Sequence, residues 1–148
     1  MKKLFPESID NKNPNKFVLI FAWLLFGFNM FRSLEHIFSE DGGAESIAGI
    51  PLSTYSAEAA NNIVSMFAQW GFSQLVLSLF FLLVLMRMRD LIPLMLLILA
   101  LENILRLVVG LYKPLVLGDA PPGSLSWVIG LVTLAVFFLS IREKRVSK

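Results

Sequence analysis

Four long apolar stretches, separated by short polar segments, occupy most of the 148-residue chain. They run over about 17–38, 60–88, 91–112 and 125–141. Because a helix needs roughly 20 apolar residues to cross about 30 Å of hydrocarbon, the pattern predicts a membrane protein. The expected fold is all-α, with four transmembrane helices in an up-down-up-down bundle. Little chain is left for a soluble domain, so residues 1–148 are expected to form one integral membrane domain.

Local signals refine two of these spans. Ser56 is a candidate N-cap and Glu58 falls in the first turn that follows it, where a negative charge is favoured. A helix from there to Met88 has about 30 residues and measures roughly 45 Å, so it must tilt or protrude from the bilayer. Pro93 lies in the first turn of the third span, where proline is tolerated. Polar loops are expected at 39–59 and 113–124.

The distribution of Lys and Arg predicts the orientation. Four lie in the N-terminal tail, two in the short turn between the second and third spans, and four in the C-terminal tail, whereas the two longer loops carry only Lys113. The first of these loops is acidic. By the positive-inside rule both termini are cytoplasmic and both loops face outward. For a bacterial source this means the inner membrane.

Composition excludes several kinds of chemistry. The chain has a net charge of +2 and a pI near 9.1, but its basic residues flank the spans. This placement is typical of residues that set membrane topology and not of a nucleic-acid-binding surface. The absence of cysteine excludes disulfides, thiolate nucleophiles and cysteine-ligated metal centres. A single His36 argues against a histidine metal site. No cofactor motif is present, so neither a metal nor a cofactor is predicted.

Polar residues inside the spans gather near one membrane face. On helical wheels they occupy one arc of each helix, and all lie toward the predicted outer end, while the inner halves of the second and third spans are almost purely apolar. We therefore expect a polar layer in the outer half of the bundle. The candidate ligand-binding residues are Arg32, Glu35, His36, Asn62, Gln69, Glu102, Asn103 and Arg106.

The cost of charge in a bilayer makes this layer informative. An Arg, Lys or Asp at the centre of a spanning helix costs roughly 2.5 to 3.5 kcal/mol on insertion scales, so such residues indicate function when a partner can be named. Glu102 precedes Arg106 by four residues, the favoured order for a helical ion pair, and Glu35 can pair with Arg32 or Arg106 across helices. Each also has a structural interpretation, as a buried pair that fixes packing or as a side chain that extends to the interface.

Three functional hypotheses follow. The first is a small receptor-like module that binds an amphiphile or lipid-like ligand in an outward-facing polar pocket. The second is an assembly subunit or homo-oligomer whose polar faces meet across protomers. The third is a membrane enzyme that uses Glu102 or His36 as acid or base, which has the least support because no nucleophile or cofactor motif accompanies them. Membrane lipids are the expected partners.

The segment from Gln69 through Arg106 to Lys113-Pro114 and Pro121-Pro122-Gly123 also resembles uncharacterised small four-helix bacterial inner-membrane proteins. In that pattern an intramembrane Arg on the third helix precedes a Gly and a Lys-Pro. The resemblance implies a four-helix membrane fold over the whole chain. It implies no activity and no functional residue.

Overall fold

The computed structural model describes residues 9, 11, 13–118 and 122–142. These residues form four α-helices, three short 3-10 turns and no strands. The helices are α1 (Lys16–Phe38), α2 (Ala57–Arg87), α3 (Ile92–Tyr112) and α4 (Ser126–Arg142), and the turns are η1 (Leu52–Thr54), η2 (Arg89–Leu91) and η3 (Pro122–Leu125). The expected all-helical fold is confirmed for the described residues.

The helix ends follow from local capping. The side chain of Asn15 accepts a hydrogen bond from the Phe17 amide at 2.8 Å and begins α1. Ser56 caps α2 as expected, because its hydroxyl accepts from the Ala59 amide. Pro93 lies in the first turn of α3, where a backbone N–H has no partner within the helix, so proline costs no hydrogen bond there. These signals place the helices within a few residues of the apolar stretches.

Three of the helical segments are long and apolar enough to cross a membrane: Lys16–Phe38, Ala57–Arg87 and Arg89–Tyr112. The fourth, α4, is apolar but has 17 residues, which corresponds to about 25 Å of helix. Large apolar side chains are exposed on the outside of every helix, for example Leu24, Val76, Val108 and Leu131. Apolar exposure on this scale is typical of surfaces that contact lipid or other proteins.

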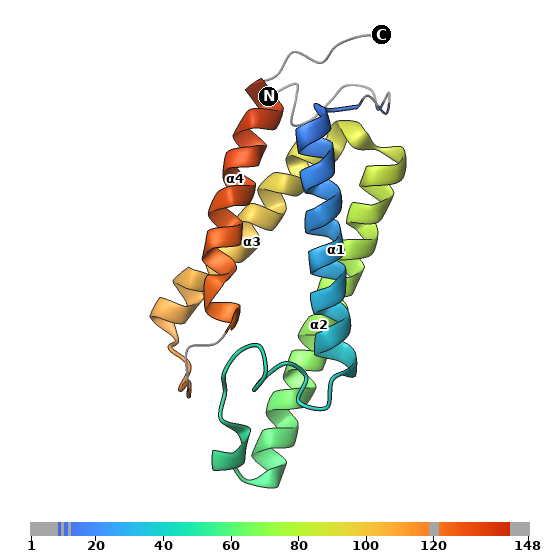
Figure 1. The fold of residues 1–148 in the computed structure, drawn as a ribbon. Coiled ribbons are helices and arrows are strands. Elements are labelled where there is room, and N and C mark those ends of the chain that lie inside the picture. The colour runs from blue at the N-terminus through green and yellow to red at the C-terminus, as the bar shows by residue number, and fades with distance from the viewer. Residues whose placement is uncertain (1–8, 10, 12, 119–121, 143–148) are drawn as a thin grey trace.

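The helices pack as two antiparallel pairs. We call α1 with α2 the first helix pair and α3 with α4 the second helix pair, because each helix makes most of its contacts within its own pair. The pairs join at the short α2–α3 turn, where Val18, Phe81, Leu85 and Leu96 form a fully buried apolar core. Figure 1 shows the pairs diverging from this turn toward the end that carries the two longer loops. The two pairs are therefore least tightly joined near those loops.

Close packing within each pair depends on glycine. A Cβ at Gly71 would lie 2.7 Å from the His36 Cβ and 3.1 Å from the Ser33 carbonyl oxygen, so α1 and α2 cross closely at this point. A Cβ at Gly130 would lie 2.9 Å from Ile104 and 3.1 Å from the Asn103 Cβ, which brings α4 equally close to α3. Small residues allow this approach between apolar helices.

Candidate functional site

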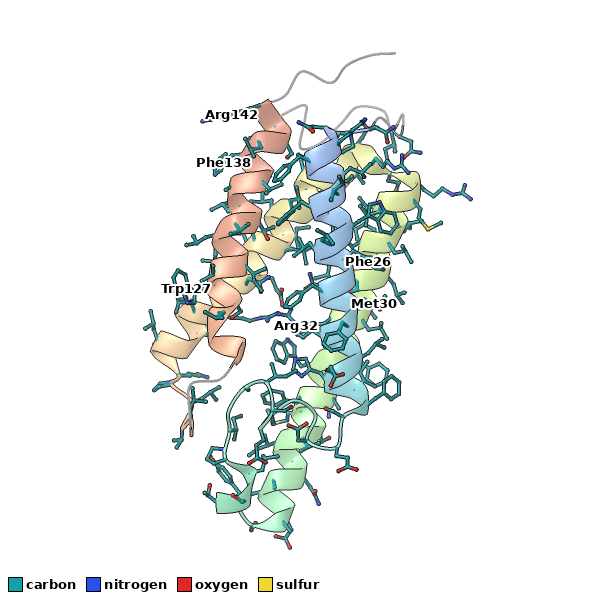
Figure 2. All side chains as sticks on the ribbon, viewed as in Figure 1. Phe26, Met30, Arg32, Trp127, Phe138 and Arg142 are labelled. Atoms are coloured by element: carbon teal, nitrogen blue, oxygen red, sulfur yellow. The ribbon has the colours of Figure 1, made fainter. Side chains whose placement is uncertain are left out.

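A charged cluster lies where the two helix pairs diverge. We define the cluster by Arg32, Glu102 and Arg106, together with the amide side chains of Asn29, Gln74 and Asn103. Figure 2 labels Arg32 in the space between the first and second helix pairs. Residues from α1, α2 and α3 contribute to it, so the cluster is a tertiary feature and not a local one.

Arg32 is the buried centre of the cluster. It is 7% exposed and donates from Nε to the Gln74 Oε1 at 3.1 Å and from Nη2 to the Asn29 Oδ1 at 3.2 Å. The same Nη2 lies 3.8 Å from the Glu102 Oε2. Asn29 is itself held by a hydrogen bond from its Nδ2 to the Leu25 carbonyl. Arg32 therefore links α1 to both α2 and α3.

Glu102 is shared between two guanidinium groups. It pairs with Arg106 one turn along α3 and with Arg32 across the helix pairs. The Asn103 amide also approaches the Glu102 Oε2, at 3.4 Å. The side chains of Glu102 and Arg106 are 26% and 21% exposed, whereas that of Arg32 is 8% exposed. No other carboxylate among the described residues forms an ion pair with these arginines, so the cluster carries one positive charge in excess.

Aromatic side chains cover one side of the cluster. The Arg106 guanidinium carbon lies 4.7 Å from the centre of the Trp70 ring, a cation–π contact. His36 packs on the same tryptophan with ring centres 4.9 Å apart, and Phe67 completes the group. Arg32 lies 5.6 Å from the Phe28 ring. Trp70 thus connects the arginine of α3 to the histidine of α1.

Several buried polar atoms of the described residues lack a hydrogen-bond partner. They are the His36 Nε2, the Gln74 Nε2, the Asn103 Oδ1 and the Thr133 Oγ1. Leaving a buried donor or acceptor unsatisfied costs about 1 to 3 kcal/mol. Two of them, on Gln74 and Asn103, belong to side chains that already contact Arg32 or Glu102. The cluster therefore has unused donor and acceptor capacity beside its excess charge.

The loop after α1 packs beside the cluster. The His36 Nδ1 lies 2.8 Å from the Gly42 carbonyl oxygen, which makes it the donor in that bond. Gly43 has φ of +71°, and a Cβ there would lie 2.7 Å from the His36 Nδ1, so both the backbone shape and the space require glycine. The segment 42–44 is buried. The sequence predicts a polar loop here, and its glycine-rich half folds inward.

Asp41 organises this loop. Its carboxylate accepts hydrogen bonds from the amides of Gly43, Glu45 and Ser46 at 2.9, 3.1 and 2.7 Å. Partial burial of the carboxylate alone would raise its pKa, but these bonds outweigh burial and hold the Asp41 pKa well below its usual range. Asp41 is therefore ionised at neutral pH and fixes the turn that places Gly42 against His36.

An apolar groove adjoins the cluster on the side of α1 and α4. It has a volume of about 260 Å³. The residues that line it are Phe21, Leu24, Leu25, Phe28, Val128, Ile129 and Val132. Phe28 belongs to both features, because its ring also contacts the Arg32 guanidinium. A charged group and an apolar surface thus meet at one side chain.

The structure brings some of the eight candidate ligand-binding residues together and leaves the others apart. Arg32, Glu102, Asn103 and Arg106 lie together in the cluster, and His36 joins it through Trp70. The remaining three lie outside the described ion pairs: Glu35 is half-buried, and Asn62 and Gln69 are exposed. Arg32 pairs with Glu102 of α3, and Glu35, which lies on α1 with Arg32, is in none of the described ion pairs.

The sequence groups Asn29 with Arg32 on one polar face and marks Gln74 as an interhelical hydrogen-bonding residue, but neither is among the eight ligand-binding candidates. A usable signal for Gln74 was its spacing, because Gly71, Gln74 and Ser78 recur at helical intervals and are all buried. Asn29 lies three residues before Arg32, one turn away on the same face of α1. Small and amide residues at these intervals marked the helix faces that meet.

The fold and the site together define a class: an all-helical protein with membrane-span-length apolar helices and a charged cluster between its helix pairs. Comparison with family models, with curated proteins and with solved structures gives no match. The function is therefore inferred from the chemistry of the cluster and the groove.

Proposed function

We propose that this protein binds an amphiphile with an anionic head group, held by Arg32 and Arg106, with its apolar chain in the groove between α1 and α4. The observation that carries the proposal is that two guanidinium groups share the single carboxylate of Glu102. A phosphate or carboxylate head group would supply the missing negative charge. Arginine is suited to this role because its planar fork binds such anions in two places.

The membrane setting strengthens the charge argument. An unneutralised arginine within a spanning segment costs roughly 2.5 to 3.5 kcal/mol on insertion scales, and an anionic ligand would recover part of that cost. The unsatisfied Gln74 amide nitrogen offers an additional donor beside Arg32. We place the head group in the outer half of the bundle, with both termini cytoplasmic, as the distribution of Lys and Arg predicts.

The experiment is a binding measurement on matched charge variants. The protein is purified in a neutral maltoside detergent, and dodecyl phosphate is titrated in while native mass spectrometry counts the bound molecules. Arg106→Gln should weaken binding about tenfold, the effect of losing roughly 1.4 kcal/mol. Arg87→Gln removes the same charge from an exposed site at the far end of α2 and should leave binding unchanged.

A second variant tests the charge count without removing an arginine. Gln74→Glu places a carboxylate where the Gln74 Oε1 already accepts from Arg32, and it removes the unsatisfied amide donor. The cluster is then neutral, so dodecyl phosphate should bind more weakly although both arginines remain. If Arg106→Gln and Gln74→Glu both bind like the parent, the head-group site is wrong.

An assembly subunit is the second candidate function. The exposed side chains of Gln69 and Ser73 favour it, because polar groups on an apolar helix surface can hydrogen-bond to another protein in a bilayer. Since the chain has no cysteine, a single Gln69→Cys substitution can be crosslinked in native membranes without background. A chain that stays monomeric in this assay contradicts the assembly role.

A further inference from the structure

Two backbone hydrogen bonds join the loops at the diverging end of the helix pairs. The Gly118 amide donates to the Gly49 carbonyl oxygen, and the Gly123 amide donates to the Ile47 carbonyl oxygen, each at 2.9 Å. A Cβ at Gly123 would lie 2.9 Å from that same Ile47 oxygen, so a side chain there would push the loops apart. Figure 1 shows the loop after α1 arching toward the connection between α3 and α4. We call this pairing the loop contact.

The loop contact lies at the end of the molecule from which a water-soluble ligand would approach. The first loop also fills the space beside His36, because Gly42, Gly43 and Ala44 are buried and Gly42 is bonded to the His36 ring. The described parts of the two loops are thus held together at this end of the molecule, which favours a ligand that need not enter between them.

The groove offers a different route. Its lining comes from α1 and α4, the first and last helices, which contact each other little. The residues that line it are all apolar, and one of them, Phe28, also contacts the Arg32 guanidinium. At about 260 Å³ the groove is slightly smaller than the roughly 300 Å³ at which pockets for whole small molecules begin. It can hold part of a lipid chain while the remainder stays outside.

From these observations we infer that the ligand is a membrane phospholipid with an anionic head group, which enters sideways from the bilayer between α1 and α4. The inference rests on the proposed function, and it adds the class of ligand and its route. Charge complementarity selects the occupant: the excess guanidinium charge takes the phosphate, and the groove beside it takes one acyl chain. A phospholipid never needs to cross the loop contact to reach this position.

The test fills the groove and leaves the cluster intact. Val132→Trp fills it from α4 and Leu24→Trp fills it from α1, and far-UV circular dichroism with gel filtration confirms that each variant folds. Leu131→Trp is the matched control, because Leu131 is exposed, adjacent in sequence and outside the lining. Each protein is reconstituted in phosphatidylcholine vesicles that contain deuterated phosphatidylglycerol, and native mass spectrometry measures the phosphatidylglycerol that it retains.

Retention should fall roughly tenfold in both groove variants and remain unchanged in Leu131→Trp. Equal retention in all of them would overturn the groove as the chain site. If Arg106→Gln loses the lipid in that case, the head-group site of the proposed function survives, while its chain site in the groove and the present inference both fail. If Arg106→Gln also retains the lipid, the proposed function itself fails.

A crosslink tests the route separately. Ala48 and Leu117 flank the bonded glycines Gly49 and Gly118, and an Ala48→Cys/Leu117→Cys pair joined by a short bis-maleimide locks the loop contact. The rate of phosphatidylglycerol uptake should not change, whereas a block of uptake would establish entry through the loops. Inorganic phosphate added to the vesicles should not displace the lipid. Displacement would show that a free anion is the ligand and would overturn the inference.

Discussion

Replacement of Glu102 by Gln changes the charge of the cluster while preserving its shape. The glutamine oxygen can still accept a hydrogen bond from Arg106, but the negative charge that two guanidinium groups share is lost. At 3.8 Å, the attraction between Arg32 and Glu102 is about 4 kcal/mol for an effective dielectric constant near 20, before the cost of desolvation. Removing one member of a buried pair typically costs about 3 to 5 kcal/mol. Because the Glu102 side chain is 26% exposed, we expect the lower value, about 3 kcal/mol.

The same substitution should strengthen ligand binding. Without the carboxylate, no negative charge competes with an anionic head group for the two arginines, and dodecyl phosphate should bind about tenfold more tightly. Stability is measured by unfolding with sodium dodecyl sulfate in mixed micelles, followed by far-UV circular dichroism, and binding by native mass spectrometry. Glu45→Gln, an exposed loop carboxylate, should alter stability by less than about 0.5 kcal/mol. A Glu102→Gln protein as stable as the parent would refute the shared-carboxylate reasoning.

Three further predictions use the helix crossing, the loop and the topology. Gly71→Ala should destabilise the protein by about 1 to 3 kcal/mol in the same unfolding assay, because the added Cβ meets α1. Gly27→Ala is the control and should not destabilise it, since nothing lies within 4 Å of a Cβ at that position. Equal effects of the two substitutions would contradict the close crossing. Because the Asp41 pKa is lower in the folded state, its stabilising contribution is full above the unfolded-state pKa near 4 and is lost as the pH falls. Asp41→Asn should remove the part of the free energy of unfolding that is lost at acid pH. An unaltered pH profile of unfolding would contradict this role of Asp41. A membrane-impermeant maleimide added to intact cells should label Ser53→Cys and not Arg87→Cys, and the reverse pattern would invert the topology.

The sequence predicted the helices well because their signals are local. Apolar runs, the Ser56 cap and the position of Pro93 each act within one or two turns, and α2 begins at the residue after that cap. The same reasoning placed Arg32, Glu102 and Arg106 at one depth, because position along a helix converts directly to height in a bundle. Depth was therefore predictable for these three residues.

The partner of Arg32 was not predictable in the same way. Gln74 is 42 residues distant and its contact with Arg32 depends on how α2 is rotated against α1, which is set by the close approach at Gly71. A helical wheel groups Asn62 with Gln69 on one face of α2. In the structure both side chains on that face are exposed. The choice between Glu35 and Glu102 likewise depended on the packing of the second helix pair against the first.

The charge count favours the proposed binding role over packing as the reason for the cluster. If the cluster served only to fix the helix pairs, apolar side chains could do so without desolvating charge, since apolar replacements for buried pairs are often neutral or stabilising. Here two arginines instead share one carboxylate. The second guanidinium, that of Arg106, contacts an aromatic ring and remains partly exposed, so it stays accessible to an anion. An excess cation beside an apolar groove is the arrangement expected for a site whose negative charge arrives with its ligand.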